Sequence, residues 1–137
     1  MEKQIIRTDN APAPFQGAPY NQAVVAGDLV FVAGQLGLKP GDAAVGGGIT
    51  EQTTQALENL SAILEAAGSS LDKLVKTSVF LMDLEDFAAM NEVYARYVGD
   101  RPPARSTFQV AKLPSGALVE IEAVAFSPLR AATAPTA

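Results

Sequence analysis

Residues 50–67 constrain the fold more than any other part of this 137-residue chain, because their apolar side chains recur at helical spacing. The expected helix has an apolar face composed of Thr53, Ala56, Leu57, Leu60, Ile63, Leu64 and Ala67. A helix with one apolar stripe must bury that stripe against another layer of structure. Thr50 is expected to cap its start, and Gly68 stands where a left-handed C-terminal glycine belongs.

Segments with strand character surround this helix and would supply the layer. They are Asn21–Ala26, Leu29–Ala33, Leu74–Met82, Ser106–Ala111 and Ala117–Phe126, with a further short strand expected at Gln4–Arg7. A second helix is predicted over Leu84–Val98. This order favours an α+β fold, with one sheet that carries both helices on one face. The length indicates a single domain over residues 1–130, followed by a C-terminal tail at 131–137.

The last predicted strand has two unlike faces. One face would pack under the helices and is formed by Val119, Ile121, Ala123 and Ala125. The other face is formed by Leu118, Glu120, Glu122, Val124 and Phe126. That second face is too apolar for free water and too charged for a closed core. Because exposed apolar patches mark contacts with other chains, we predict a homo-oligomer that covers this face.

The residue types that are absent exclude several kinds of chemistry. The chain has no His and no Cys, so a Ser-His-Asp triad, a thiolate nucleophile and an iron–sulfur cluster are ruled out. Any metal would need oxygen ligands, and proton transfer falls to carboxylates, Tyr, Lys or bound water. The formal charge of −5, with scattered basic residues, argues against nucleic-acid binding. No secretory signal and no membrane span are recognisable, so we expect a cytoplasmic protein.

Arg105 is the first candidate for a functional side chain. It follows Pro102 and Pro103, which restrict the backbone and would aim the guanidinium. Arginine binds carboxylates through two parallel hydrogen bonds, so Arg105 could hold an acidic ligand. An ordinary surface or interface ion pair explains an arginine at this position equally simply.

Glu120 and Glu122 form the second candidate, because residues two apart in a strand point to the same face. Two acids on a partly apolar face raise the pKa of a carboxyl group, which would suit proton transfer near neutral pH. The alternative is that they pair with Arg105, Lys112 or a backbone amide across an interface.

Two further positions could line a pocket. Tyr20 ends a proline-rich loop and could present its hydroxyl, although packing is the commoner role of such a ring. Gly34 stands at the end of a predicted strand, where a glycine lets a ligand approach the backbone. The triplet Gly46-Gly47-Gly48 lacks a phosphate-binding pattern and indicates a loop, and the apolar stripe of the second helix indicates core.

Together these residues resemble one known family, the reactive intermediate deaminases (Rid, also called YjgF-like or L-PSP proteins). The resemblance is carried by PARSTFQVAKLP at 103–114 followed by VEIEA at 119–123. Shorter matches in the same order are APY at 18–20, AGQ at 33–35, EAAG at 65–68 and VKT at 75–77. The similarity covers the chain from about Ile5 to Ser127.

The resemblance implies a chorismate-mutase-like fold, with a mixed sheet of about six strands and two helices on one face. It implies a homotrimer with clefts between neighbouring subunits. The implied activity is hydrolysis of enamine and imine intermediates, such as 2-aminoacrylate and 2-iminopropionate, to 2-oxo acids and ammonia, without metal or cofactor. By this resemblance Arg105 would grip the substrate carboxylate, Glu120 would position water and Tyr20 would line the cleft. Gly34 and Thr107 would contact the substrate through their backbones.

The chain also departs from the family pattern. Ala33 stands where many members have Ser or Thr, and Thr107 stands where many have Cys. The resemblance still places Ala33 among the expected substrate-binding positions, but without the hydroxyl group that Ser or Thr would supply there. Two other functions stay open: a non-enzymatic trimer that binds small carboxylates, and a ribonuclease or translation inhibitor. The second is disfavoured, because RNA cleavage usually needs His or a metal, and RNA binding needs positive charge.

Overall fold

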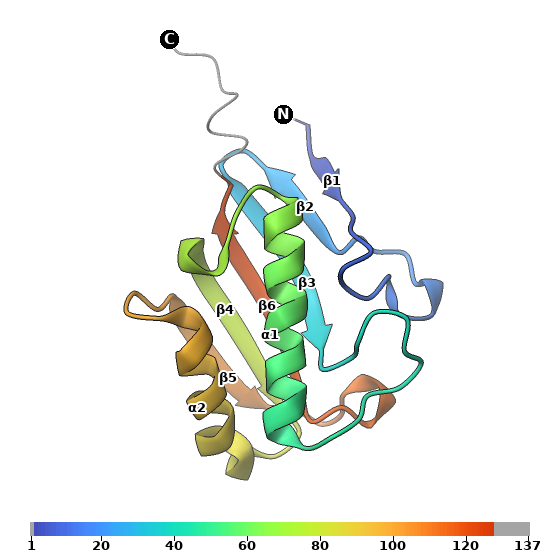
Figure 1. The fold of residues 1–137 in the computed structure, drawn as a ribbon, viewed down its shortest axis with the longest axis vertical. Coiled ribbons are helices and arrows are strands. Elements are labelled where there is room, and N and C mark those ends of the chain that lie inside the picture. Colours follow the sequence, from blue (N-terminus) through green and yellow to red (C-terminus); the bar gives the residue numbers. More distant parts are fainter. Residues whose placement is uncertain (1, 128–137) are drawn as a thin grey trace.

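The computed structural model describes residues 2–127, and its six strands form one mixed sheet (Figure 1). The strands are β1 (Gln4–Ile6), β2 (Ala23–Ala26), β3 (Leu29–Leu36), β4 (Leu74–Leu81), β5 (Ala104–Gln109) and β6 (Val119–Phe126). Their order across the sheet is β1-β2-β3-β6-β4-β5. Only the β4–β5 pair is parallel, because α2 connects these strands as a crossover.

Two helices, α1 (Ile49–Ala66) and α2 (Phe87–Val98), lie on the same face of the sheet (Figure 1). The largest fully buried side chains come from α1, α2 and the three central strands, and include Leu57, Leu60, Met90, Val79 and Ile121. Short 3₁₀ turns precede or follow several of these elements, at Phe15–Gly17, Leu71–Lys73, Leu84–Asp86 and Pro114–Gly116. The predicted fold class is therefore confirmed, with both helices covering one side of a six-stranded mixed sheet.

The two ends of α1 follow different rules. The helix begins after Gly48, whose N–H donates to the Glu51 carboxylate, so the prediction that Thr50 caps it was wrong. Thr50 lies within the first turn, and Glu51 satisfies a free N–H while placing negative charge at the positive helix end. The C-terminal prediction is confirmed, because Gly68 adopts φ +75° and the Ser69 N–H donates to the Leu64 carbonyl.

Strand β3 runs on to Leu36 rather than ending at Ala33 as predicted. Two further strands differ from their predicted patterns. β5 begins at Ala104 rather than Ser106, since its pairing with β4 extends back to that residue. In β4, strict alternation would place Val75 on one face with Thr77, Val79 and Leu81, but the register shifts between Leu74 and Lys76, so Leu74 is buried and Val75 is exposed. Both differences arise from pairing with distant strands, which a local pattern does not contain.

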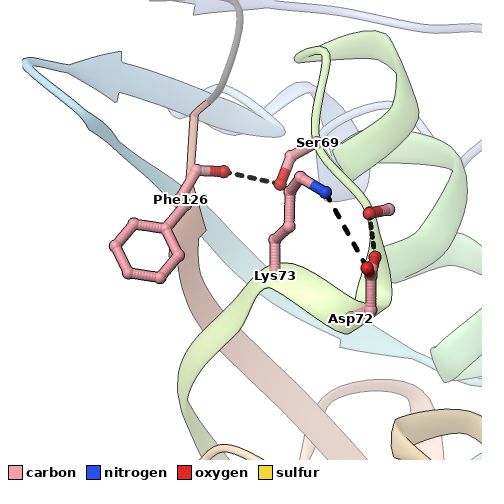
Figure 2. A network of polar contacts seen from close by, with 5 residues as sticks. Ser69, Asp72, Lys73 and Phe126 are labelled. Carbon is pink, nitrogen blue, oxygen red and sulfur yellow. Dashed lines mark hydrogen bonds and ion pairs between the residues drawn. The ribbon is translucent and has the colours of Figure 1, made fainter. Parts of the chain in front are cut away.

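A polar contact ties the end of β6 to the segment after α1 (Figure 2). The Ser69 hydroxyl donates a hydrogen bond of 2.6 Å to the Phe126 carbonyl. Beside it, the Asp72 carboxylate accepts from the Ser70 hydroxyl and lies 3.8 Å from the Lys73 ammonium. This network lies at the opposite end of β6 from Glu120.

The two faces of the sheet differ, as the sequence pattern of the last strand predicted. Val119, Ile121, Ala123 and Ala125 are at most 4% exposed under the helices. The other face carries no helix, and it exposes Phe31, Phe108 and Phe126 together with Glu122. The residue range of the expected tail, 131–137, lies outside the described residues. Neither helix of residues 2–127 is long and apolar enough to cross a membrane.

Candidate functional site

Glu120 lies on the open face of β6, between Leu36 of β3 and Phe80 of β4. Its carboxylate rests directly over Gly34: a Cβ added to that glycine would lie 2.7 Å from the Glu120 Cδ and 2.8 Å from Oε2. No side chain other than hydrogen fits there unless the carboxylate moves. The close approach expected at Gly34 is therefore made by Glu120 itself.

A β-bulge in β3 shapes this contact. Between Val32 and Gln35 the strand has one more residue than β6 has between Ala123 and Ile121, so Ala33 and Gly34 share one position in the ladder. Bulges bend a strand and redirect its side chains, and they are common beside active sites. Here the bulge brings the backbone of β3 under the Glu120 carboxylate.

The Glu120 carboxylate forms part of the wall of an open pocket of about 370 Å³. The pocket is lined by Phe15, Ala18, Tyr20, Ala33, Gly34, Leu36, Pro114 and Glu120. We call this set the acidic half-site. Three of the residues expected at the site, Tyr20, Ala33 and Gly34, thus lie together with Glu120. Most of the remaining lining is apolar, which lowers the local dielectric constant around the one carboxylate.

Tyr20 stands at the rim of this pocket and is held by the proline-rich loop. Its hydroxyl oxygen accepts a hydrogen bond of 2.6 Å from the Phe15 N–H. The ring is 40% exposed, so it is not a core residue. The hydroxyl proton of Tyr20 stays available to donate into the pocket.

The electrostatics of the acidic half-site favour the protonated form of its acid. Burial raises the pKa of Glu120 above its ordinary value of 4.5, and the neighbouring negative charge of Glu122 raises it further. Arg105 does not contribute to this shift. A raised pKa makes this carboxylate a stronger proton acceptor than an ordinary exposed glutamate.

Arg105 lies on the other face of the sheet. Arg105 pairs with Thr77 between β5 and β4, and paired residues point to the same face of a sheet. The Thr77 side chain is buried under α2, so the guanidinium also points toward the helices. The guanidinium carbon lies 4.8 Å from the centroid of the Tyr94 ring and 5.5 Å from that of the Phe87 ring. Such cation–π contacts hold a guanidinium in place while leaving its N–H groups free to donate. Burial raises the pKa of Tyr94, and its hydrogen bond to Thr77 and the charge of Arg105 oppose that rise.

No carboxylate of residues 2–127 lies within ion-pair distance of Arg105. Thr107 is two residues further along β5 and faces the same side, opposite Val79. We call Arg105, Thr107, Phe87 and Tyr94 the cationic half-site. One chain thus holds the expected site in two parts that lie on opposite faces of the sheet. Each part has one kind of charge and lacks the other.

Two buried amides hold the loops below the acidic half-site. Asn59 of α1 donates to the carbonyls of Leu36 and Leu38, at 3.2 Å and 2.7 Å. Gln52 accepts from the Leu118 N–H at 2.9 Å and donates to the Gly47 carbonyl at 2.9 Å. These contacts connect α1 to the end of β3 and to the segment before Glu120. The position of the carboxylate is therefore set by the helix layer as well as by the sheet.

Comparison with known proteins supports one assignment. The family model described as "Endoribonuclease L-PSP" matches residues 8–127. The chain belongs to the L-PSP family. Its resemblance to the Rid proteins is thereby confirmed, and it covers almost all of the described residues.

Named relatives of this L-PSP chain include deaminases. The mouse protein named 2-iminobutanoate/2-iminopropanoate deaminase is 45% identical over 124 residues, which cover 90% of each chain. The crystal structure of RidA from an Antarctic Psychrobacter is 46% identical, with a TM-score of 0.85 over 90% of this chain and 98% of that one. The Escherichia coli protein TdcF, solved with bound serine, is 40% identical, with a TM-score of 0.84 over 90% and 98% of the two chains.

Sequence reasoning missed three residues that lie in or next to the two half-sites. Phe87 belongs to the apolar stripe of α2, yet it is 41% exposed beside Arg105. Asn91 lies between Phe87 and Tyr94 on α2, and its buried Oδ1 has no hydrogen-bond partner among the described residues. Pro114 lines the acidic half-site. A signal was present for Asn91, because one amide interrupts the apolar stripe of α2.

Proposed function

We propose that this protein hydrolyses small 2-imino acids, and their enamine tautomers, to 2-oxo acids and ammonia at a site shared by two copies of the chain. The observation that carries the proposal is the Glu120 carboxylate, which is held over Gly34 in a mostly apolar pocket with a raised pKa and no cation beside it. The names of the deaminase relatives agree with this chemistry.

The charges of the two half-sites favour assembly between copies. The acidic half-site offers a proton-transfer group but no anchor for a carboxylate, whereas the cationic half-site offers Arg105 but no acid. When the cationic half-site of one copy faces the acidic half-site of the next, each cleft contains both groups. This contact is head-to-tail, and a head-to-tail contact that closes on itself gives a ring. We propose a homotrimer, which would also cover the exposed phenylalanines of the open sheet face.

Substrate binding begins with the cationic half-site. Arg105 receives the substrate carboxylate through two N–H groups, and the rings of Phe87 and Tyr94 keep the guanidinium from turning away. The free Oδ1 of Asn91 offers an acceptor on the same helix face for a substrate N–H. Backbone groups at Thr107 and, from the neighbouring copy, at Gly34 complete the contacts. The C=N carbon is then oriented toward Glu120 of the neighbour.

The chemistry needs only orientation and proton transfer. Glu120 takes a proton from water as the oxygen adds to the C=N carbon, and that proton passes to the imine nitrogen, giving a carbinolamine. Glu120 then takes the hydroxyl proton and delivers it to the amino nitrogen, so the C–N bond breaks, ammonia leaves and the C=O bond of the 2-oxo acid forms. An enamine first takes a proton on its terminal carbon and loses one from nitrogen, which the same carboxyl group can perform. An imine carbon is already electrophilic, so positioning accounts for most of the acceleration.

A coupled assay tests this function. A serine dehydratase generates 2-aminoacrylate, and release of pyruvate is followed with and without the protein. We expect acceleration by the wild type, and a loss of about a hundredfold in Arg105→Ala and in Glu120→Gln. Arg101→Ala, which removes an exposed arginine four residues before Arg105, is the matched control and should keep full activity. Binding of pyruvate without acceleration would instead indicate a carboxylate-binding protein.

A mixing experiment tests the shared site. Arg105→Ala and Glu120→Gln are each expected to be inactive alone. When the two are denatured, mixed in equal amounts and refolded together, about a quarter of the clefts combine an intact Arg105 with an intact Glu120. Activity should recover to that fraction of the wild type. No recovery, with mixed oligomers verified by mass spectrometry, would show that the two groups act within one chain or not at all.

A further inference from the structure

The buried side chain of Gln22 holds the first part of the proline-rich loop, residues 8–12, and the rest of the loop carries one wall of the acidic half-site. The loop belongs to the long connection between β1 and β2 and includes Phe15, Ala18 and, at its end, Tyr20. Residues 7–22 are not part of the sheet. Their position must therefore come from other contacts.

Gln22 supplies those contacts through every polar atom of its carboxamide. The two N–H donors on its Nε2 are shared among the carbonyls of Thr8, Ala11 and Pro12, which lie 3.0, 3.2 and 2.9 Å away. Its Oε1 accepts from the Thr8 N–H at 2.8 Å. The residue is only 3% exposed, so water does not compete for these bonds. The side chain thus closes the segment 8–12 into a fixed arc.

The backbone of Gln22 connects this arc to the bulge beneath Glu120. Its carbonyl accepts from the Ala33 N–H at 2.9 Å, one residue before Gly34. Gln22 also follows Tyr20 by two residues, and Tyr20 in turn holds the Phe15 N–H. One residue therefore joins the arc, the aromatic wall and the bulge, although its side chain does not line the acidic half-site.

We propose that Gln22 is a positioning residue that sets the affinity of the acidic half-site for its ligand, an inference that rests on the proposed function. Its hydrogen bonds fix the position of the pocket wall formed by Phe15 and Tyr20 relative to the Glu120 carboxylate. Neither Glu120 nor Arg105 lies on the arc, so the proton-transfer step itself does not depend on it. Loss of Gln22 should weaken substrate binding much more than it slows turnover.

The test uses Gln22→Ala and Gln22→Met, the second of which keeps the length of the side chain and removes its hydrogen bonds. In the coupled assay we expect KM to rise about five- to tenfold while kcat stays within about twofold. Ser69→Ala is the matched control, because it removes a buried hydrogen bond to a backbone carbonyl at the far end of β6. It should lower the melting temperature and leave KM unchanged.

Two readouts independent of turnover separate this inference from the proposed function. Hydrogen exchange should become faster across residues 8–20 in both Gln22 variants while α1 and β6 keep their protection. The affinity for pyruvate, measured by calorimetry, should fall by the same factor as KM rises. If the wild type binds pyruvate without deaminase activity, the proposed function fails, and a weaker affinity in the variants still supports the role of Gln22. Unchanged KM and pyruvate affinity, with only a lower melting temperature, would overturn it.

Discussion

The covered and open faces of the sheet are built from alternate residues of the same strands, yet they differ in almost every physical property. On β6, Ile121 is fully buried under the helices, while its neighbours Glu120 and Glu122 point away from them. The covered face is mostly apolar and packs against α1 and α2, with Arg105 of the cationic half-site on its β5 edge. The open face combines phenylalanines with carboxylates and carries the acidic half-site along one end.

On β6, the core side chains and the candidate acid Glu120 therefore lie on opposite sides of one strand. The covered face supplies the burial that holds the fold together. The open face contains features that lower the stability of the fold, namely a half-buried acid, a bulge and exposed rings. Burial on the covered face must compensate for them. Substitutions on the two sides should therefore fail in different ways.

The largest effect is expected on the covered face. Ile121→Ala removes a fully buried side chain between the sheet and α1, and it should cost about 2–5 kcal/mol in the free energy of unfolding. Glu122→Ala, one residue further along and pointing to the open face, should change it by about 0.5 kcal/mol or less. Urea unfolding followed by circular dichroism measures both. Equal losses would show that the two faces are not energetically distinct.

Association should depend on the open face. Phe31 is 46% exposed there, in a shallow hollow that it shares with Lys76, Ser78 and Glu122. Phe31→Asp would place a second carboxylate beside Glu122 in a surface that we propose is buried between copies, so association should weaken about a hundredfold. Thr50→Asp adds the same charge on the helix side and should leave it unchanged. Sedimentation velocity measures the association of both variants. An unaltered oligomer in Phe31→Asp would exclude this face as the interface.

A substitution at Gly34 should lower activity while changing stability little. In Gly34→Ala the new methyl group would displace the Glu120 carboxylate, which lies at the flexible end of its side chain, so folding should suffer little. The displaced acid should lower kcat/KM about tenfold or more. Gly46→Ala is the control, because a Cβ at that glycine meets no atom within 4 Å. Full activity in Gly34→Ala would contradict the role given to Glu120.

The smallest effect concerns pH. Burial and the charge of Glu122 both raise the pKa of Glu120, so a higher pH is needed to ionise it. Glu122→Gln removes the second cause and lowers that pKa toward its ordinary value. The acid limb of the profile of kcat/KM against pH should consequently move to lower pH, by less than the burial contribution. A shift to higher pH would indicate that Glu120 is not the ionising group.

Much of the fold could be predicted because it depends on local periodicity. The two faces of β6 follow from a period of two, and the buried stripe of α1 follows from a period of 3.6. The misplaced features depend on partners distant in sequence. The bulge at Ala33 and Gly34 exists only in relation to β6, and the burial of Leu74 in place of Val75 likewise reflects pairing with β6.

The sequence indicated which residues belong to the candidate site, but it did not show how they are arranged. The residue types and the family resemblance pointed to Arg105, Glu120 and Tyr20. That Glu120 points to the open side follows from the period of two in β6, but that Arg105 faces the helices depends on the register of β5 against β4, which no local pattern specifies. The signal at Asn91, a single amide in the apolar stripe of α2, could be interpreted only when the structure placed Arg105 beside Phe87 and Tyr94.

The position of β6 has a consequence for how the molecule is made. It is the last strand along the chain, yet it lies between β3 and β4 in the middle of the sheet. During synthesis the ribosome releases residues 23–36 and 74–81 well before residues 119–126. The earlier strands must wait with their central edges unpaired, so the nascent chain is exposed to aggregation until β6 emerges and joins the two halves.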